Sequence, residues 1–414
     1  MLKVKKIQQK FDNTKIKDIT GHIKKEFDNS GIKNKINPGQ DIAVTVGSRG
    51  ISNIKLIVRE VITNLKKIGV NPFIIPAMGS HGGATARGQE DILASYGITE
   101  KEMKVPVKSS MDTVKIGEIE EVPIYFSKQA LEADGIIALN RIKMHTDFHS
   151  NILESGMSKI LVIGLGKHKG ASSIHSRGVY GLKKLIPRAA ELILEKAPVI
   201  QGIGLVENAY EKIMKIEFTP SDEIISKDGE LLKLAENKMP TLPVNELDIA
   251  VVQEMGKDIS GTGLDTNVIG RLYINGEKEY TSPQIKRLLV LDLTDSSHGN
   301  AIGIGLADIT TRRLVDKIDY KDTYENVKTS SFLQRGKIPL TMKNEKEAFE
   351  LAIKTSWLKE NQKPKIIIMK NTQELEELYV SEPVLKEINQ EKIEELGNWE
   401  QINFDENNRL IPTL

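Results

Sequence analysis

Cysteine is absent from this 414-residue chain, and histidine is scarce, with seven residues. Without cysteine the protein can form no disulfide, thiolate nucleophile, iron–sulfur cluster or thiolate zinc site. A transition metal would have to be held by histidine, by carboxylates or by donors that a cofactor brings with it. The positions of the few histidines are therefore the most informative part of the sequence.

An excess of charge of one sign and a long apolar run are also lacking. Lys and Arg number 58 against 57 Asp and Glu, so the net charge of +1 provides no positive field for bulk nucleic-acid binding. No apolar run reaches the roughly 18 residues of a membrane-spanning helix, and residues 1–6 lack the apolar core of a signal peptide. We therefore expect a cytoplasmic protein that binds neither nucleic acid nor membrane. The lysine clusters at 15–17, 24–25 and 33–35 are expected on a solvated edge strand and helix.

What the sequence does contain is an alternation of apolar strand, glycine-rich turn and amphipathic helix. Residues 41–47 (DIAVTVG) have the composition of a buried strand, and residues 53–68 repeat apolar side chains at helical spacing. A strand at 71–77, a loop at 78–85 and a helix near 89–96 follow. Units of this length imply parallel βαβ crossovers, so the sequence predicts an α/β fold.

The pattern continues along the chain, and we predict two domains, 1–262 and 263–414. Each is expected to be a mainly parallel sheet with flanking helices, with the active site in the interdomain cleft. The first would bind the cofactor and carry catalysis, and the second would close over the cleft, with the extreme C-terminal tail allowed to return to the first. The further predicted elements are strands at 134–139, 159–165, 247–252, 287–293, 301–306 and 365–369 and helices at 182–197 and 345–355.

His81 lies in a Gly-Ser-His-Gly-Gly loop between a predicted strand and a predicted helix. In open α/β sheets, ligands bind at the carboxyl ends of the strands, and glycines let a ligand approach the backbone closely. A tight turn with a solvated histidine is the alternative, but the position favours a functional residue.

Four of the seven histidines fall between residues 145 and 175. His145 follows a predicted strand with Arg141 and Lys143 beside it, and positive charge there would attract an anionic substrate and lower the pKa of the imidazole. His149 is four residues further on, but no helical pattern surrounds the pair and no Glu follows His145, which excludes an H-E-x-x-H zinc motif. His168, between lysines and glycines, is most simply a solvated loop residue.

Several basic residues are candidates for substrate or cofactor binding. Arg49 follows a strand in a Ser-Arg-Gly turn, and its planar guanidinium can bind a carboxylate through two hydrogen bonds, although an exposed turn charge is an equal alternative. Lys159 opens an apolar run, where most lysines would be surface residues. Lys257, Arg271 and His298 could line a cleft from the second half of the chain, and each also fits a surface loop.

Taken together, these segments resemble the nickel-pincer-nucleotide-dependent hydroxyacid racemase and epimerase family (lactate racemase-like), most clearly between residues 41 and 180. In that family two histidines act as bases, a Ser-Gly-x-x-Lys segment carries the cofactor, and a histidine sixteen residues later binds nickel. The Gly-Ser-His sequence that ends at His81 matches the loop of the first base. Ser155-Gly156-Met157-Ser158-Lys159 matches the cofactor segment, and His175 stands sixteen residues after its lysine.

The resemblance implies nickel and a pyridinium-3,5-bisthiocarboxylic acid mononucleotide bound covalently to Lys159. Ser155 and Gly156 would lie at the cofactor and His175 would bind the metal. The cofactor's own sulfurs would reconcile a soft metal site with a cysteine-free chain. Proteins that make and insert the cofactor are the implied partners, besides a small hydroxyacid substrate.

The resemblance also implies His81 and a second histidine as the pair of bases, with Arg49 holding the substrate carboxylate. His145, nearer the end of its predicted strand, is our choice for the second base. His149 keeps the family's ten-residue spacing to Lys159 and remains the alternative.

Two departures concern the substrate. Val46 stands three residues before Arg49, where the lactate-specific member has Asp, and the C-terminal Tyr-Gln-x-x-Lys element has no clear counterpart. We therefore expect a larger or more anionic hydroxyacid than lactate. The basic and polar groups behind this expectation are Arg141, Lys143, Lys257, Arg271 and His298, of which Lys257 and His298 are the named candidates for substrate binding.

The sequence thus predicts an isomerase: a racemase or epimerase of a 2-hydroxyacid that transfers a hydride reversibly. An NAD-type α/β oxidoreductase is the alternative among enzymes, disfavoured because no G-x-G-x-x-G follows the first strand. A non-catalytic anion-binding homologue that kept the cleft is the alternative outside enzymes.

Overall fold

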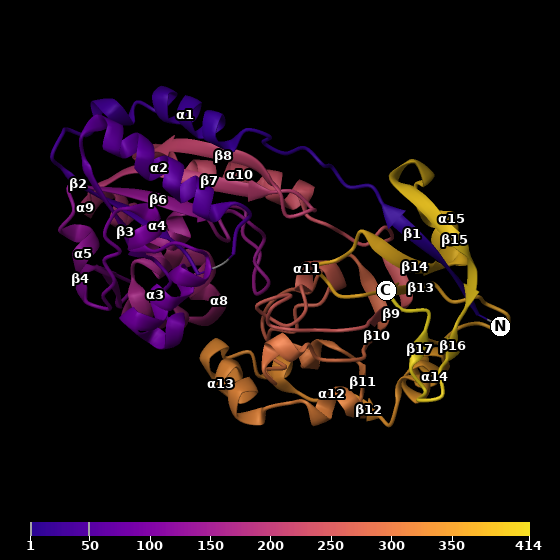
Figure 1. The fold of residues 1–414 in the computed structure, drawn as a ribbon. Coiled ribbons are helices and arrows are strands. Elements are labelled where there is room, and N and C mark those ends of the chain that lie inside the picture. Colours follow the sequence, from indigo (N-terminus) through magenta and orange to yellow (C-terminus); the bar gives the residue numbers. More distant parts are fainter. Residues whose placement is uncertain (1, 49) are drawn as a thin grey trace. The chain divides into compact units, whose positions relative to one another are not determined.

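We analysed a computed structural model that describes residues 2–48 and 50–414 (Figure 1). The chain forms two compact units, which we describe separately. The central unit comprises residues 12–239, and the terminal unit comprises the first 11 residues together with 240–414.

This division differs from the predicted one in two respects. Strand β9 (Glu246–Val252) pairs with β10 (Gln284–Val290) and β13 (Ile366–Met369), so residues just before 262 belong to the sheet of the terminal unit. The second difference concerns the chain ends. We allowed the C-terminal tail to return to the first domain, but it is the N-terminal strand β1 (Lys3–Gln9) that joins the sheet of the terminal unit. It lies between two antiparallel neighbours, β14 (Glu377–Ser381) and β15 (Ile393–Gln401), and is therefore not the edge strand expected from the sequence.

The central unit is built on one sheet in the order β3-β2-β6-β7-β8. All neighbours are parallel except the last pair, β7 and β8. Side chains of β2 alternate between the two faces, as in any strand, and both faces are covered by helices, so the strand is apolar on both sides. The bounds of the strands are β2 (Asp41–Val46), β3 (Asn71–Pro76), β6 (Gly135–Arg141), β7 (Val199–Glu207) and β8 (Ile213–Pro220), with a separate hairpin of β4 (Thr113–Ile119) and β5 (Val122–Ser127).

Helices α1 and α2 pack on one face of this sheet through a core that includes Phe27, Ile57 and Val61. On the other face, Gly202 and Gly204 of β7 let Met157 and α10 approach the sheet, since a Cβ at either position would press against them. The helices of this unit are α1 (Ile19–Asn29), α2 (Ile54–Ile68), α3 (Ala86–Ser95), α4 (Glu100–Met103), α5 (Lys128–Leu131), α6 (Met157–Lys159), α7 (Lys167–His175), α8 (Gly178–Tyr180), α9 (Ile186–Lys196) and α10 (Ile224–Lys238).

The apolar run 159–165 was predicted as a strand, and this was wrong. It forms the end of α6 and a π-helical turn, η3 (Ile160–Gly164), which is almost entirely buried. A short run that is apolar on all sides does not distinguish a buried strand from a buried helix. The second π-helical turn, η4 (Gly181–Leu185), leads into α9, so that the helix predicted at 182–197 is interrupted at its start.

The terminal unit contains a sheet in the order β12-β11-β10-β9-β13-β14-β1-β15. The strands from β12 to β13 run parallel, and the remaining neighbours pair antiparallel. Residues 301–306, predicted as a strand, form a loop and the 3₁₀ turn η7 (Ile304–Leu306) instead. Further elements are β11 (Ile309–Thr311), β12 (Leu340–Met342), β16 (Asn403–Phe404), β17 (Leu410–Ile411), α11 (Thr266–Ile269), α12 (Arg312–Asp316), α13 (Tyr320–Ser330), α14 (Glu345–Thr355) and α15 (Glu382–Glu387). Short 3₁₀ turns occur at η1 (Ile32–Asn34), η2 (Gly82–Ala84), η5 (Ser221–Glu223), η6 (Asp295–Ser297), η8 (Leu333–Gly336) and η9 (Gln390–Lys392).

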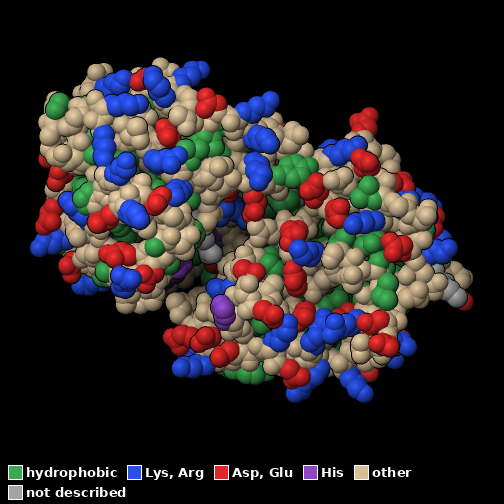
Figure 2. Space-filling view, in the orientation of Figure 1, with side chains coloured by type: hydrophobic (Ala, Val, Ile, Leu, Met, Phe, Trp, Pro, Cys, Tyr) green, Lys and Arg blue, Asp and Glu red, His purple; other side chains and the backbone are tan. Residues whose placement is uncertain are grey.

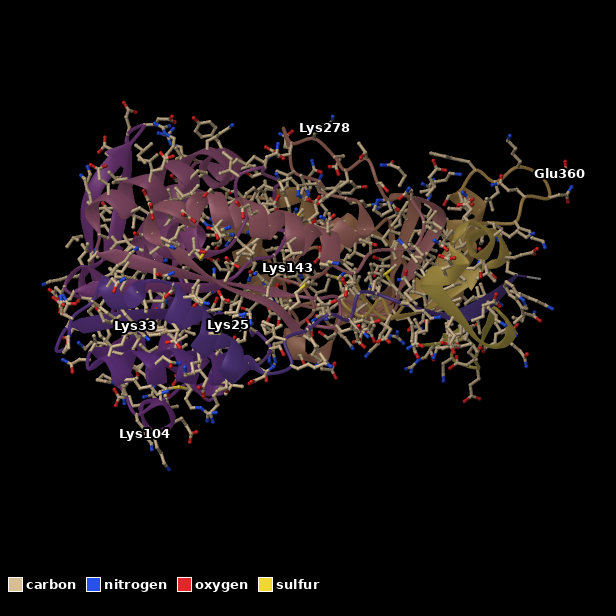
Figure 3. The ribbon with its side chains drawn as sticks, turned by 90° about the horizontal axis from the view of Figure 1, so that it is seen from above. Lys25, Lys33, Lys104, Lys143, Lys278 and Glu360 are labelled. Carbon is tan, nitrogen blue, oxygen red and sulfur yellow. The ribbon has the colours of Figure 1, made fainter. Side chains whose placement is uncertain are left out.

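The surface carries both signs of charge. On the face drawn in Figure 2, Lys and Arg side chains are interspersed with Asp and Glu, as the near-zero net charge requires. Lys25 and Lys33, from the predicted lysine clusters, are exposed on α1 and η1 (Figure 3), and Lys33 pairs with Asp28 at 2.6 Å. Among the helices that the structure describes, none is long and apolar enough to cross a membrane.

The α/β class predicted from the sequence is confirmed, since both sheets are mainly parallel and flanked by helices.

Candidate functional site

Several candidate residues of the central unit follow strands at the point where the strand order of the sheet reverses. Strand β3 lies on one side of β2, and β6, the next strand of the sheet along the chain, lies on the other side. The carboxyl ends of such diverging strands leave a crevice, which is the usual ligand site of an open α/β sheet. Ser48 follows β2, the loop of His81 follows β3, and His145 follows β6. Arg49, predicted to hold the substrate, lies outside the described residues.

His81 is exposed at the end of its loop, and its Nδ1 forms a hydrogen bond with Ser48 Oγ. The loop turns because Gly79 and Gly82 adopt positive φ values of 57° and 68°, which glycine tolerates without strain. From behind, the amide of Gln89 on α3 donates hydrogen bonds to the carbonyls of Gly79 (3.0 Å) and His81 (3.4 Å). The imidazole is thus presented on a loop that is held at both ends.

Lys167 supports the same loop from inside the protein. It is completely buried, adopts a φ of +53°, and its ammonium donates to the carbonyl of Pro76 at the end of β3 and to Gln89 Oε1 at 3.2 Å. Burial lowers the pKa of Lys167 to about 8. A buried ammonium therefore orients the glutamine that in turn holds the His81 loop.

A buried carboxylate, Glu154, organises the loop after β6. Its Oε2 accepts the backbone N–H of His145 at 2.7 Å, and its Oε1 accepts the backbone N–H of Ser150 at 2.8 Å. Oε1 also lies 3.1 Å from Nδ1 of His149. The side chain of Glu154 is only 2% exposed, so both candidate histidines are fixed by one buried group.

The cofactor segment is joined to the same loop. Ser155 Oγ accepts the N–H of Lys143 at 2.7 Å and donates to its carbonyl at 2.6 Å, and Asn140 donates to the carbonyl of Gly156 at 2.8 Å. Lys143 itself is exposed and is labelled in Figure 3. Lys159 Nζ donates to the carbonyl of Glu154 at 3.3 Å.

Two features require glycine at position 156: its backbone conformation and the close approach of Asp228. Its φ of +101° is unfavourable for any other residue, and a Cβ there would clash with Asp228 Oδ1. Asp228, on α10, accepts the N–H groups of Met157 (2.9 Å) and Ser158 (2.7 Å) at the start of α6. Complete burial raises the pKa of Asp228 to about 6, against the lowering effect of these hydrogen bonds.

His175, the predicted metal ligand, is the last residue of α7 and is exposed to solvent. Its pKa is lowered, first by the loss of hydration beside the protein and next by the positive charge of Lys159, while Asp147 opposes the shift. A lowered pKa favours the neutral imidazole that binds metals.

Two of the remaining basic candidates, Arg141 and Arg271, form ion pairs within the protein. Arg141 is paired with Glu207 at 2.7 Å, and Arg271 is buried, where it pairs with Asp308 at 2.7 Å and donates to the carbonyl of Leu306. Arg271 therefore has a structural role, and the larger substrate expected from the sequence can no longer be argued from it.

Lys257 and His298 belong to the terminal unit, where Ser297 connects them: its Oγ accepts the N–H of Lys257 at 2.8 Å. Lys257 Nζ also donates to the carbonyl of Gly261 at 2.8 Å and to Asn326 at 3.1 Å. Both residues follow parallel strands, β9 and β10, at the edge of the sheet where a ligand site is expected.

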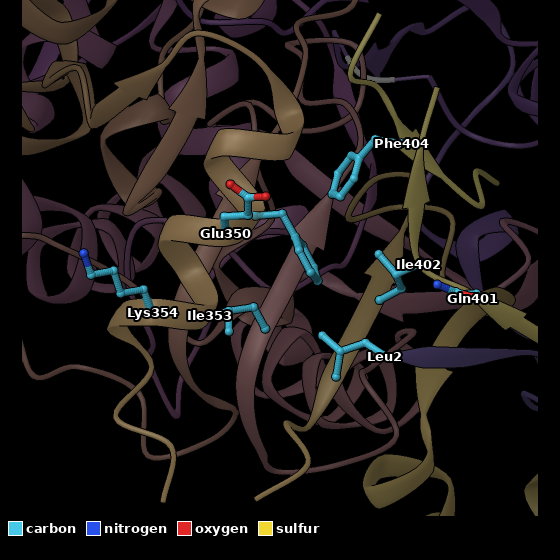
Figure 4. A pocket seen from close by; sticks show the side chains of 8 residues that line it. Leu2, Glu350, Ile353, Lys354, Gln401, Ile402 and Phe404 are labelled. Carbon is cyan, nitrogen blue, oxygen red and sulfur yellow. The ribbon is translucent and has the colours of Figure 1, made fainter. Parts of the chain in front are cut away.

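A cavity of about 360 Å³ in the terminal unit is a different feature (Figure 4). Leu2, Phe349, Ile353, Ile402 and Phe404 give it an apolar lining. None of the candidate residues lines it, so we do not assign it to the site.

Sequence reasoning missed the residues that hold the site from behind: Ser48, Gln89, Glu154, Lys167 and Asp228. Of these, Glu154 alone left a signal in the sequence, because it stands directly before the Ser-Gly of the cofactor segment. Asp228 lies about seventy residues from the backbone it caps, a contact that no local pattern indicates.

Comparison with known proteins agrees with this picture. Residues 1–183 match the model of the lactate racemase N-terminal domain. The fold is similar to that of the lactate racemase apoprotein from Thermoanaerobacterium thermosaccharolyticum, with a TM-score of 0.54 and 13% sequence identity over 88% of this chain and 93% of that one. No curated protein matches the sequence. The resemblance to lactate racemase-like proteins seen in the sequence is thus supported by the family model over residues 1–183 and by the similar fold.

Proposed function

We propose that the protein is a nickel-pincer-dependent racemase or epimerase of a 2-hydroxyacid. The proposal is supported by the match of residues 1–183 to the lactate racemase N-terminal domain and by the way Asp228 holds the segment of Lys159 through the N–H groups of Met157 and Ser158. Lys159 and His175 lie in the unit that also contains His81, His145 and His149.

The residues present fit the cofactor by their chemistry. Lys159 offers an amine for covalent attachment, on a segment fixed by Gly156 and Asp228. His175 offers an exposed imidazole whose pKa is lowered toward the neutral form. In the described residues, 2–48 and 50–414, no group of three or more His, Asp or Glu is placed to hold a metal. Nickel bound through His175 would take its other donors from the cofactor's sulfurs.

When bound, a pyridinium ring with a nickel–sulfur pincer supplies a reversible hydride acceptor. The chain's own residues then have to manage the hydroxyl proton. A neutral imidazole removes it as the C2 hydride leaves, and a second imidazole on the other side returns a proton as the planar 2-keto acid is reduced on its opposite face. Both bases need pKa values near the working pH, which histidine provides.

The strand order supports a two-base arrangement. His81 follows β3 and the second histidine follows β6, and these strands flank β2 on either side. Two strand spacings amount to about 10 Å, enough for a small hydroxyacid between the two imidazoles. The second base is His145 or His149. Arg49, which follows β2 in the sequence, is proposed to bind the substrate carboxylate.

The substrate is proposed to be larger or more anionic than lactate. After Arg141 and Arg271 are assigned to ion pairs, this proposal rests on Val46 and on Lys143. Proteins that synthesise and insert the cofactor are the proposed partners, and the cytoplasm is the proposed compartment.

The test is to co-express the chain with the cofactor-synthesis proteins and to measure intact mass, nickel content and racemisation of a panel of 2-hydroxyacids and aldonates. We expect an adduct on Lys159, about one nickel per chain, and inversion of at least one acid. Lys159→Ala should abolish the adduct. His175→Ala should lose nickel and keep the fold, whereas His168→Ala, an exposed residue of the same helix, should retain both.

Unmodified Lys159 under these conditions would contradict the proposal. Net oxidation of a hydroxyacid with NAD would indicate the oxidoreductase instead, and tight binding of the acid without turnover would indicate an anion-binding protein.

A further inference from the structure

Glu154 lies at the meeting point of the residues that the proposed mechanism needs, yet it has no role in it. It is nearly completely buried, and three donors surround its carboxylate: the backbone N–H groups of His145 and Ser150 and the ring of His149. Its own carbonyl accepts from Lys159. One residue therefore contacts the loop of the second base and the lysine of the cofactor segment.

The contact with Glu154 determines which nitrogen of His149 carries the proton. An ionised carboxylate can only accept hydrogen bonds. Nδ1 of His149, at 3.1 Å from Oε1, must therefore be the donor. In the neutral ring the lone pair is then on Nε2, which is the form of a general base.

His145 is held in the opposite form. Its Nδ1 accepts the backbone N–H of Asp147 at 3.1 Å, so Nδ1 cannot carry a proton and the neutral ring carries it on Nε2. The carboxylate of Asp147 lies 3.7 Å from the same nitrogen, too far for a hydrogen bond. The ring also packs against Phe148, with centroids 4.7 Å apart, which limits its rotation.

We propose that Glu154 is a positioning residue that fixes the tautomers of this loop: His149 presents a lone pair at Nε2, and His145 presents an N–H. On the proposed function, on which this assignment of roles rests, His149 is the base opposite His81. His145 is then a hydrogen-bond donor to the substrate. This proposal favours His149 over His145, our choice from the sequence, because a sequence does not show which ring nitrogen faces a carboxylate.

The tautomers can be measured on the full chain without cofactor. With ¹⁵N-labelled histidine, the shifts of Nδ1 and Nε2 report which nitrogen is protonated, at a pH where the rings are neutral. His145→Asn and His149→Asn assign the signals. We expect the proton on Nδ1 of His149 and on Nε2 of His145. The reverse for either ring in the wild-type chain overturns the proposal.

A substitution then tests the role of Glu154 itself. Glu154→Leu removes the acceptor and should move the proton of His149 toward Nε2, while Glu154→Gln, which keeps a carbonyl acceptor, should partly restore the original form. Glu345→Leu is the matched control, since Glu345 is also buried and accepts a backbone N–H, that of Leu410 at 2.7 Å. It should leave the histidine signals unchanged. A His149 tautomer that is unaffected by Glu154→Leu would refute the role of the carboxylate.

In the loaded enzyme, Glu154→Leu should lower kcat by about 100-fold or more, the usual contribution of a correctly protonated base, with the nickel content and the Lys159 adduct unchanged. Unchanged kcat would contradict the assignment of His149 as base. If no adduct forms in the wild type, the proposed function fails while the tautomer result still stands, so the two failures can be told apart.

Discussion

At the scale of single residues, the site depends on buried charges that lie one layer behind the groups expected to meet the substrate. Lys167 orients Gln89 behind His81, and Glu154 orients His149. The ammonium of Lys167 donates to a backbone carbonyl and to an amide oxygen, both uncharged acceptors. Such a charge is costly to bury, and its retention indicates a task other than stability.

The free-energy cost of burying the Lys167 charge predicts how the stability of the protein depends on pH. The pKa of Lys167 is about 8 in the folded chain and 10.5 as the ordinary value, so above pH 8 the unfolded state binds the proton more strongly. The free energy of unfolding contributed by this group should therefore rise between pH 8 and 10.5. Urea unfolding of Lys167→Met should lack this rise, while Lys169→Met, an exposed residue of the same helix, should retain it. Parallel pH profiles for Lys167→Met and wild type would show that burial does not shift this lysine.

At the scale of elements, the segment that carries Lys159 is a short helix held at its start by a carboxylate from another helix. Met157 and Ser158 donate to Asp228, and Gly156 makes room for the contact. The π-helical turn η3 follows directly, and such turns are frequent at functional sites. The position of Lys159 thus depends on packing between α6 and α10.

Gly156→Ala should break this arrangement. The added methyl would meet Asp228 at a φ of +101°, and we expect a loss of about 2 kcal/mol in the free energy of unfolding, more than a left-handed alanine costs alone. Gly31→Ala is the control, because its φ is +69° but nothing lies within 4 Å of the added carbon. It should cost only about 1 kcal/mol. Equal losses in chemical denaturation would show that the contact with Asp228 is not what requires the glycine.

Elements with a clear period could be predicted from the sequence, and those without one could not. Helices α2 and α14 were placed to within a residue, because their apolar side chains recur at helical spacing. The run 159–165 is apolar on every side, so its period carries no information, and only its packing against the sheet makes it helical. The strand ends that carry His81 and His145 followed from βαβ logic, whereas the contacts of Glu154 and Asp228 depend on tertiary structure.

At the scale of the whole molecule, we predicted domains 1–262 and 263–414, whereas the compact units are residues 12–239 and the first 11 residues together with 240–414. Strand β1 is far in sequence from its partners β14 and β15, and no local pattern indicates such a pairing. Without it, β14 would become an exposed edge strand, and β15 would lose its neighbour in the sheet.

A single substitution in β1 tests this. Ile7 is fully buried, and Ile7→Asp should lower the stability of the terminal unit by roughly 3 kcal/mol or more. Hydrogen exchange should accelerate in β9 and β13 and remain unchanged in β2 and β6. Lys3→Ser, at an exposed position of the same strand, is the control. Faster exchange in β2 and β6 instead would mean that β1 stabilises the central unit.

The position of β1 also has a consequence for synthesis. Residues 3–9 leave the ribosome long before their partners, residues 377–401. The central unit contains its own sheet and can fold while translation continues, as domains generally do. Strand β1 must therefore remain unpaired until residues 377–401 have been synthesised. The three lysines of its sequence, at positions 3, 5 and 6, would help to keep it from pairing wrongly during that interval.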